Sequence, residues 1–449
     1  MKVLLINPSY THIYGNFAPA AKVGVLHPPL GISYLAANIN TNHQVKILDM
    51  EINPDIDGTI KSFKPDIVGV SFSTPLYNQA LDLFKHIKEL DKNIHTIAGG
   101  PHPTTLPDSV ISSSYVDTVL PGEGEIAINK FLDNPTKGIL PREPLVQDLD
   151  TIQFPARHLL ENDKYLFSVP GKGTIPLTSF ASSRGCSFQC TFCSAHLMFG
   201  RTVRNRSIKN CIEELKEIKN KYNINHLSWI DDTLGVDKKR TFDLMDEMIK
   251  ENIDLTFEGY TRVNVMTKEL LEKLKKAGLV RLSFGVESGN QEILNTIKKG
   301  INLEQIRKAY EIADEVGIET RMSIIFGLPG ETEETIKKTI KFMKSLKCNQ
   351  AYVNVLVPFP GTEVYEDAKK GTGGLQLLTE DWKEYRRWGN AVINVNDLSA
   401  QDLIKWQRKA LLSFYLRPKQ IYYHIRRAGL KSFYSNGMAF VKSFVGKKK

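Results

Sequence analysis

The chain has 449 residues, a formal net charge of +9 and only five cysteines, and its 41% hydrophobic and 24% charged content is that of an ordinary globular protein of two or three domains. No apolar run approaches the ~18 residues of a membrane-spanning helix, and the short apolar start predicts a first strand instead of a signal peptide. We therefore expect a cytoplasmic protein without a disulfide framework.

Residues 1–140 alternate short apolar runs with helical stretches, which predicts a doubly wound parallel sheet with crossover helices, among them Gly31–Asn40 and Asn78–Leu90. Ligands of such sheets bind beyond the carboxyl ends of the strands. The strands are predicted at Val3–Asn7, Val45–Asp49, Ile67–Ser71, Ile94–Ala98 and Thr118–Leu120. Small, polar and glycine residues follow these strands, and we take them as candidate ligand-binding positions: Pro8, Ser71, Ser73, Thr74, Gly99, Gly100, Gly122, Glu123 and Gly124.

Residues 141–175 are rich in proline and are predicted to form a linker. Six further βα units follow within residues 176–370, which predicts a partial (β/α)6 barrel with its chemistry at the carboxyl ends of the strands. The barrel strands are predicted at Ile175–Ser183, His226–Ile230, Leu255–Gly259, Val280–Phe284, Glu319–Phe326 and Tyr352–Leu356. Residues 371–449 are predicted to be a helical extension.

Three of the five cysteines, Cys186, Cys190 and Cys193, form a C-x3-C-x2-C run just after the first barrel strand. Three thiolates on one loop can hold three irons of a [4Fe–4S] cluster and leave the fourth iron open to a small molecule. The alternatives are plain buried thiols or a structural zinc loop, for which His196 is the only nearby fourth ligand. Cys211 and Cys348 have no neighbouring cysteine and are predicted to be ordinary buried thiols.

The cysteine run and its flanks resemble the radical S-adenosylmethionine (radical SAM) superfamily. The resemblance implies a [4Fe–4S] cluster that binds S-adenosylmethionine (SAM) and cleaves it to methionine and a 5′-deoxyadenosyl radical. It implies that Phe192 packs by the adenine of SAM. It also implies SAM contacts in Gly-Val-Glu-Ser-Gly (285–289), through Glu287 and Ser288, and in the segment containing Arg321 and Gly-Leu-Pro-Gly-Glu-Thr (327–332), through Glu331.

Asp231 and Asp232 follow the second barrel strand, where that family commonly contacts SAM or substrate, and are our candidate catalytic residues. Paired carboxylates can also bind a divalent metal or divide acid and base roles. The alternative for this pair is an N-cap on the helix that begins at residue 238. For Glu331 the alternative is capping of the next helix.

The strand ends of residues 1–140, together with His-Pro-Pro-Leu-Gly-Ile-Ser-Tyr-Leu-Ala-Ala (27–37), resemble the cobalamin-binding domain that precedes many radical SAM cores. The Asp-x-His-x-x-Gly segment that supplies a histidine to cobalt is absent, and neither His12 nor His102 has that context. The resemblance therefore implies cobalamin without a histidine lower ligand, and an alternative is a histidine that reaches the cobalt from elsewhere in the chain. A degenerate domain that binds nothing is the alternative.

The net charge is concentrated at the end of the chain. Residues 401–449 carry eight Lys and four Arg against one acid, Asp402, with nine interspersed aromatics. This pattern fits a helical cap on the catalytic domain or a contact surface for a membrane, and it favours an apolar or lipid-like substrate. Phe-Tyr-Leu-Arg-Pro-Lys (414–419) resembles a segment of the phosphonate methylase and anaerobic tetrapyrrole cyclase group.

These features predict a cobalamin-dependent radical SAM enzyme that methylates an unactivated carbon by way of the 5′-deoxyadenosyl radical and methylcobalamin. Ferredoxin or flavodoxin is the implied electron donor, and no nucleic acid partner is expected. The same cofactors also serve cyclisation, ring contraction or hydroxylation. A non-catalytic cobalamin-binding or zinc-stabilised module is the third alternative.

Overall fold

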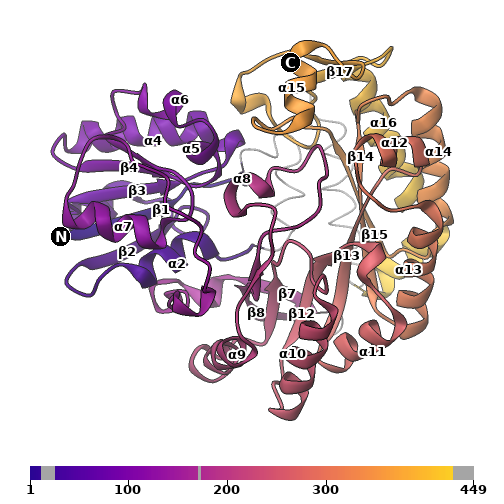
Figure 1. Ribbon diagram of the computed structural model, residues 1–449, viewed down its shortest axis with the longest axis horizontal. Coiled ribbons are helices and arrows are strands. Elements are labelled where there is room, and N and C mark those ends of the chain that lie inside the picture. The colour runs from indigo at the N-terminus through magenta and orange to yellow at the C-terminus, as the bar shows by residue number, and fades with distance from the viewer. Residues whose placement is uncertain (12–25, 170–172, 428–449) are drawn as a thin grey trace.

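The computed structural model describes residues 1–11, 26–169 and 173–427. Within these ranges the chain forms two lobes, each built on its own sheet (Figure 1). His12 and the aromatics Phe433, Tyr434, Phe440 and Phe444 lie outside the described residues. No helix in the described ranges is long and apolar enough to cross a membrane.

The N-terminal lobe is a six-stranded parallel sheet in the order β2-β1-β3-β4-β5-β6. The strand order reverses between β1 and β3, and ligands of doubly wound sheets bind at that switch point. The strands are β1 (Lys2–Asn7), β2 (Gln44–Asp49), β3 (Ile67–Ser71), β4 (His95–Gly99), β5 (Thr118–Leu120) and β6 (Gly138–Ile139). The helices are α2 (Leu30–Asn38), α3 (Ile56–Phe63), α4 (Tyr77–Leu90), α5 (Pro101–Thr105), α6 (Pro107–Ile111) and α7 (Gly124–Asp133).

Both faces of this sheet are buried. Side chains alternate along a strand, so Val3 and Leu5 of β1 pack into one apolar cluster with residues of α2 and α7. Leu4 and Ile6 pack on the opposite face with residues of α3 and α4. The continuous apolar run of β1 is thus explained by burial on two sides, as expected of a parallel strand.

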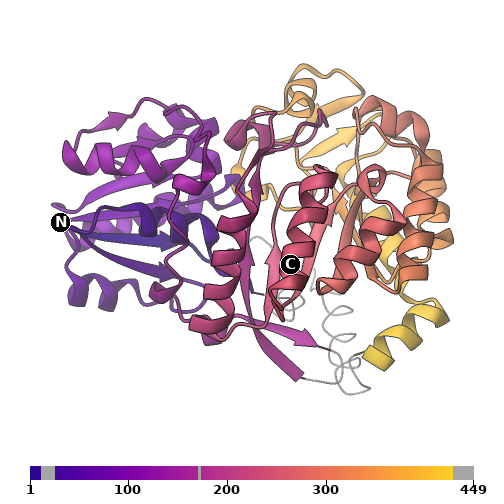
Figure 2. The ribbon, with the colours of Figure 1, turned by 60° about the horizontal axis from the view of Figure 1, so that its bottom comes forward.

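The second lobe is an arc of six parallel strands, closed at one edge by the antiparallel β7 in the order β15-β14-β13-β12-β11-β8-β7 (Figures 1 and 2). The strands are β7 (Leu166–Val169), β8 (Gly173–Phe180), β11 (His226–Trp229), β12 (Thr256–Thr261), β13 (Leu279–Glu287), β14 (Glu319–Phe326) and β15 (Gln350–Val355). The helices are α9 (Ile208–Tyr222), α10 (Lys238–Lys250), α11 (Lys268–Lys276), α12 (Gln291–Thr296), α13 (Leu303–Val316) and α14 (Glu333–Ser345). The predicted α/β class and partial barrel are confirmed.

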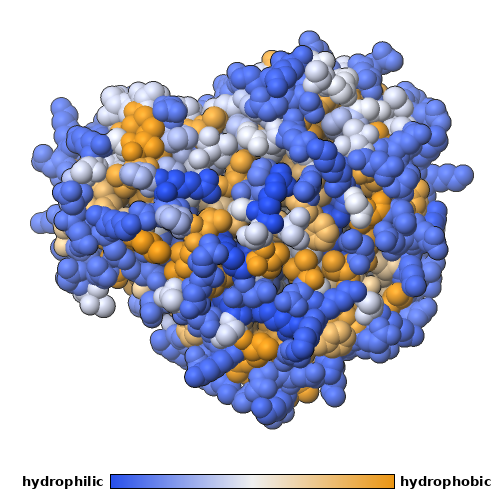
Figure 3. Space-filling view, in the orientation of Figure 1, coloured by the Kyte–Doolittle hydropathy of each residue, from blue (hydrophilic) through white to orange (hydrophobic). Residues whose placement is uncertain are grey.

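Three short elements occupy the connection between β8 and α9: β9 (Ser183–Arg184), α8 (Ala195–Phe199) and β10 (Arg204–Asn205). In Figure 1 α8 lies between the two lobes. On that face apolar residues gather toward the junction of the lobes, while hydrophilic residues cover most of the periphery (Figure 3). We therefore expect a site shared by both lobes to lie at their junction.

The C-terminal region contains α15 (Glu363–Lys370) and α16 (Ala400–Tyr415), as the predicted helical extension requires, but also the antiparallel pair β16 (Leu375–Leu377) and β17 (Ile393–Val395). Helix α16 packs on β15 and buries Leu403 and Phe414. This segment of the basic region is thus a cap on the barrel. Neither β7, which lies inside the predicted linker, nor the β16–β17 pair was expected, because such short strands carry too little periodicity.

Candidate functional site

The three candidate cysteine ligands lie on the loop between β9 and α8. The loop starts at Gly185, whose φ of +92° and tight surroundings admit only glycine: an added Cβ would lie 2.2 Å from the carbonyl oxygen of Thr202. Cys190 is buried, whereas Cys186 and Cys193 are partly exposed. The sequence therefore forms a tight loop in which two of the three cysteines remain partly accessible to solvent.

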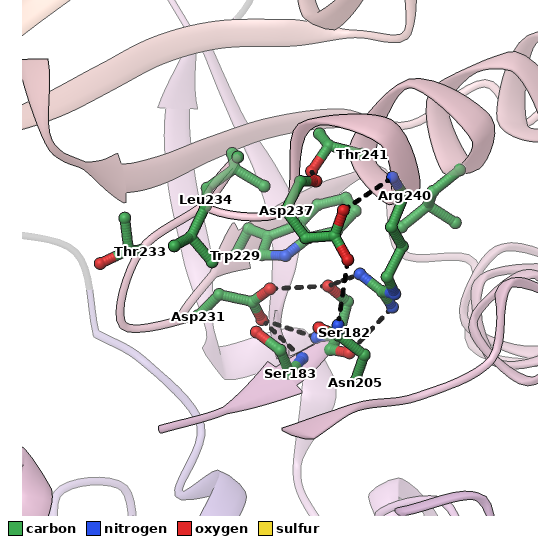
Figure 4. Close-up of a pocket in the computed structure, with 13 residues that line it drawn as sticks. Ser182, Ser183, Asn205, Trp229, Asp231, Thr233, Leu234, Asp237, Arg240 and Thr241 are labelled. Carbon is green, nitrogen blue, oxygen red and sulfur yellow. Dashed lines mark hydrogen bonds between the residues drawn. The ribbon is translucent and has the colours of Figure 1, made fainter. Parts of the chain in front are cut away.

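Asp231 fixes the start of this loop. One carboxylate oxygen accepts hydrogen bonds from the backbone N–H groups of Ser182 (2.6 Å) and Ser183 (3.1 Å), and the other accepts one from the Ser182 hydroxyl (2.6 Å), as Figure 4 shows. The residue is 4% exposed, and its carboxylate accepts these three hydrogen bonds. We conclude that Asp231 is a positioning residue for the segment that leads to the cysteines.

Asp232 differs from its neighbour. It is solvent-exposed, and its carboxylate accepts one hydrogen bond, from the backbone N–H of Gly185 (3.1 Å). The surrounding protein displaces water and raises the pKa of Asp232, and the Asp231 carboxylate adds repulsion. Neither residue is the predicted alternative N-cap of α10, because Asp237 caps that helix. Of the predicted catalytic pair, Asp232 is the one whose carboxylate is exposed and keeps most of its hydrogen-bond acceptor sites unused within the described residues.

The thiols have distinct neighbours. The Cys186 sulfur lies 3.6 Å from the Thr233 hydroxyl, and the Cys190 sulfur lies 3.4 Å from a guanidinium nitrogen of Arg262. Burial raises the pKa of Cys193, and the charges of Cys190 and Cys186 add to this effect. No three His, Cys, Asp or Glu side chains in the described ranges are grouped tightly enough to hold one metal ion. A cluster that takes each thiolate on a different iron does not need such convergence.

Glu287 is held in a strained conformation beside this loop. It ends β13 at a bulge, has a φ of +65° and is 5% exposed. A non-glycine residue persists there, at a cost of about 1–3 kcal/mol, only where the surroundings enforce it, and such residues concentrate at functional sites. Its carboxylate pairs with the Lys299 ammonium at 2.7 Å, and that ammonium lies 5.8 Å from the ring centroid of Phe192. Two predicted SAM-binding residues are thus joined through Lys299.

Ser288 and Arg321 are not brought to the cysteine loop. The Ser288 hydroxyl is fully buried against Thr339 of α14, at 3.2 Å. Arg321 lies near the start of β14, where its guanidinium contacts Glu258 at 3.5 Å and the ring of Tyr352. These contacts give both residues a part in the barrel framework, and a SAM contact for either stays a prediction.

Glu331 is completely buried and does not cap α14, because Thr332 is the N-cap. Its carboxyl group turns back and accepts hydrogen bonds from the backbone N–H groups of Gly327 and Leu328. Its second oxygen has no partner within the described residues. Burial raises the pKa of Glu331 to about 8, although these two hydrogen bonds lower it. The group is therefore protonated at neutral pH.

We expect Glu331 to make folding stability fall with rising pH. The folded state keeps the proton between the ordinary pKa of 4.5 and the raised value of about 8, whereas the unfolded chain has lost it. The contribution is thus complete below pH 4.5 and is lost as pH rises toward 8, with a slope near 1.4 kcal/mol per pH unit. Glu331→Gln should lack this part of the pH dependence in urea unfolding measured from pH 5 to 8. If the free energy of unfolding changed with pH in the same way in both proteins, the raised pKa of Glu331 would be refuted.

The predicted cobalamin positions form two groups. The first group lies at the carboxyl ends of β1, β3 and β4, around the switch point of the N-terminal sheet: Ser71 and Gly99 are the last residues of β3 and β4, and Pro8, Ser73, Thr74 and Gly100 follow their strands. Gly100 brings the chain close to β3, because an added Cβ would lie 2.6 Å from the Ser71 hydroxyl. At Gly99 an added Cβ would lie 3.7 Å from the Leu120 carbonyl oxygen, which is an ordinary van der Waals contact. Bare backbone at this edge fits a large flat ligand.

The second group, Gly122, Glu123 and Gly124, meets the other lobe instead. The buried Glu123 carboxylate pairs with Arg184 and Arg204, each at 2.9 Å, and accepts a hydrogen bond from the Val146 backbone at 2.9 Å. Glu125 adds a second pair with Arg184 at 2.6 Å. We call Glu123, Glu125, Arg184 and Arg204 the interlobe clamp. Since Arg184 is two residues before Cys186, the clamp ties the N-terminal sheet to the cysteine loop.

His102 lies in a packed environment, and its Nε2 has no hydrogen-bond partner within the described residues. It is fully buried, its Nδ1 lies 3.1 Å from the Thr74 hydroxyl, and its ring contacts Phe72, Tyr77 and Trp382. Burial lowers its pKa to about 4. This is the environment of a packed neutral histidine, in agreement with its lack of the cobalt-ligand sequence context.

Sequence reasoning missed Lys299, Arg262, Arg184 and Arg204. Arg184 adjoins the cysteine run, so its position offered a signal. The other three lie 11 to 106 residues after Cys193, and no local sequence pattern marks them. Their roles follow only from the fold.

Comparison with known proteins decides the family. Residues 181–343 match the Radical SAM superfamily and residues 18–132 match the B12 binding domain. The chain is 34% identical over 442 residues to an uncharacterized methyltransferase of Pyrococcus horikoshii, covering 93% of each protein. The chain belongs to the radical SAM superfamily. It is a radical SAM enzyme with a B12-binding domain, which excludes the non-catalytic alternative.

Two further similarities place this radical SAM enzyme more closely. It is 28% identical to the anaerobic magnesium-protoporphyrin IX monomethyl ester cyclase of Rubrivivax gelatinosus, covering 82% of this chain and 70% of the cyclase. Its fold matches that of the radical SAM methyltransferase TsrM from Kitasatospora setae, with cobalamin and a [4Fe–4S] cluster bound, at a TM-score of 0.70 and 16% identity over 99% of both chains. The family matches and the relatives confirm the predicted family, and the likeness to TsrM confirms the predicted fold.

Membership implies a [4Fe–4S] cluster, SAM and cobalamin as cofactors. Enzymes of this superfamily act on small molecules and take electrons from a reductant. The residues present fit these groups. The cysteine loop offers three thiols, of which that of Cys190 lies beside the buried guanidinium of Arg262, and the N-terminal sheet offers glycine backbone at its switch point.

Proposed function

We propose that this enzyme transfers a methyl group to an unactivated carbon of a small molecule, with both cofactor sites opening on the junction of the lobes. The interlobe clamp is the observation that carries the proposal. Glu123 and Glu125 follow the carboxyl end of β5 and form ion pairs with Arg184, which directly precedes the cysteine loop. A radical generated in one lobe and a methyl donor held in the other must act on one carbon, and the clamp fixes the two lobes for that purpose.

We assign the cofactors to residues as follows. Cys186, Cys190 and Cys193 hold the cluster, while Phe192 and Glu287, supported by Lys299, line the SAM site next to Asp232. The ends of β1, β3 and β4 hold cobalamin. When bound, these cofactors supply reductive cleavage of SAM and a transferable methyl group. The protein's own part is to orient them: Asp231 holds the loop, and Glu287 is held in its strained position by Lys299.

The proposal is tested by the two products of SAM. Protein reconstituted anaerobically with iron, sulfide and cobalamin is incubated with SAM and a strong one-electron reductant. S-adenosylhomocysteine forms when SAM donates a methyl group, and 5′-deoxyadenosine forms when SAM is reductively cleaved. We expect both products by mass spectrometry, and both should rise when an extract containing the acceptor is added. Protein without cobalamin is the control, and it should not form S-adenosylhomocysteine.

The second candidate is cyclisation, ring contraction or hydroxylation with the same cofactors. The similarity to the Rubrivivax gelatinosus cyclase favours cyclisation over ring contraction and hydroxylation. It predicts 5′-deoxyadenosine without S-adenosylhomocysteine. That outcome would reject methyl transfer in favour of the second candidate.

A further inference from the structure

Arg262 is a buried cation beside the cysteine loop that the proposed function does not use. It follows β12 and is 5% exposed. Its guanidinium lies 3.7 Å from the ring centroid of Phe188, on the cysteine loop. One terminal nitrogen lies 3.4 Å from the Cys190 sulfur, and the other donates to the Lys299 carbonyl. Stacking and hydrogen bonds thus hold the charge against the loop in one orientation.

The other buried arginines show what Arg262 lacks. Six arginines in the described ranges are fully buried, and five of them form an ion pair with a glutamate: Arg157, Arg204, Arg206, Arg281 and Arg321. Arg262 has no carboxylate within ion-pair distance among the described residues. A buried cation without a counter-charge is costly, so the protein is expected to provide one. The group it touches is the Cys190 thiol.

We propose that Arg262 is the charge partner of the iron–sulfur cluster and raises its reduction potential. The inference rests on the proposed assignment of Cys186, Cys190 and Cys193 as cluster ligands. A cluster held by three thiolates is anionic, and the one electron delivered by the external reductant adds a further negative charge. A fixed cation at one thiolate therefore stabilises the reduced form more than the oxidised form. Hydrogen bonds and charges at the sulfurs are established determinants of cluster potential.

The test is a redox titration of the reconstituted protein in the absence of SAM, in which electron paramagnetic resonance measures the fraction of reduced cluster at each potential. Arg262→Met keeps much of the length of the side chain but removes the charge and the donors. We expect its midpoint potential to shift to a more negative value than that of the wild type. Arg262→Lys keeps the charge and should lie nearer to the wild type. Arg201→Met is the matched control, because Arg201 donates to the Phe188 carbonyl from an exposed position. Its potential should not change.

Iron content, measured for every variant, separates the possible outcomes. An unchanged potential in Arg262→Met at full iron content overturns the inference. If Arg262→Met cannot hold iron, retention of iron by Arg262→Lys supports the charge pairing, whereas loss in both variants overturns it in favour of a role in loop shape. Retention of iron by Cys190→Ala would instead overturn the assignment of the cluster ligands, which is a separate failure.

Discussion

Cys190→Ala is expected to abolish both iron incorporation and formation of 5′-deoxyadenosine. In the proposed assignment each thiolate binds a different iron, so loss of Cys190 would leave one iron without a protein ligand. Cys190 is also the most enclosed of the three, buried beneath Arg262, and no other Cys of the described residues is placed to replace it. Iron and sulfide analysis after anaerobic reconstitution gives the first readout, and the absorbance of the cluster gives the second.

Cys348→Ala is the matched control for this experiment. Cys348 is buried in the barrel core, where burial raises its thiol pKa to about 11, and its sulfur contacts only framework groups such as the Gln350 carbonyl. We expect full iron content, full 5′-deoxyadenosine formation and a stability loss of about 1 kcal/mol. Equal iron content in Cys190→Ala and Cys348→Ala would contradict the assignment of the cysteine loop.

The features that sequence reasoning predicted well are those encoded locally. The three cysteines lie within eight residues, and the six parallel barrel strands are recognisable from apolar runs followed by helical periodicity. The strained Glu287 lies in a Gly-Val-Glu-Ser-Gly segment that marked it out before its conformation was known. Its partner Lys299 was not predicted, because an ion pair across twelve residues and a bulge leaves no repeating pattern.

Long-range partners account for most of what the sequence did not reveal. Gly-Glu-Gly-Glu (122–125) has the composition of a ligand-binding loop, and residue types alone do not distinguish a carboxylate facing a ligand from one facing Arg184 and Arg204. Asp231 and Asp232 are adjacent and chemically identical, yet Asp231 accepts three hydrogen bonds from Ser182 and Ser183, whereas Asp232 accepts one from Gly185. Roles of this kind depend on which distant segment folds against each side chain.

Glu123→Ala is expected to lower the free energy of unfolding by about 3–5 kcal/mol, because it leaves the buried Arg204 without its counter-charge and leaves Arg184 with Glu125 alone. The Glu123 side chain is 3% exposed, and those of Arg184 and Arg204 are 12% and 5% exposed. Burial raises the pKa of Glu123, but the hydrogen bonds from Arg204 and Arg184 outweigh it and leave the pKa below its ordinary value. This contribution is therefore present above pH 4.5 and is lost as pH falls through the lowered pKa.

A matched pair of variants distinguishes the clamp from a general charge effect. Glu89→Ala removes a glutamate of the same lobe whose ion pair with Lys85 is exposed on α4, and we expect it to cost less than 1 kcal/mol. Glu123→Leu combined with Arg204→Met removes one stranded cation as well, so it should recover part of the stability lost in Glu123→Ala. Urea unfolding at neutral pH measures all four proteins. If Glu123→Ala lost no more stability than Glu89→Ala, the lobes would not be held by this clamp, and the cysteine loop would need another anchor to face the cobalamin domain.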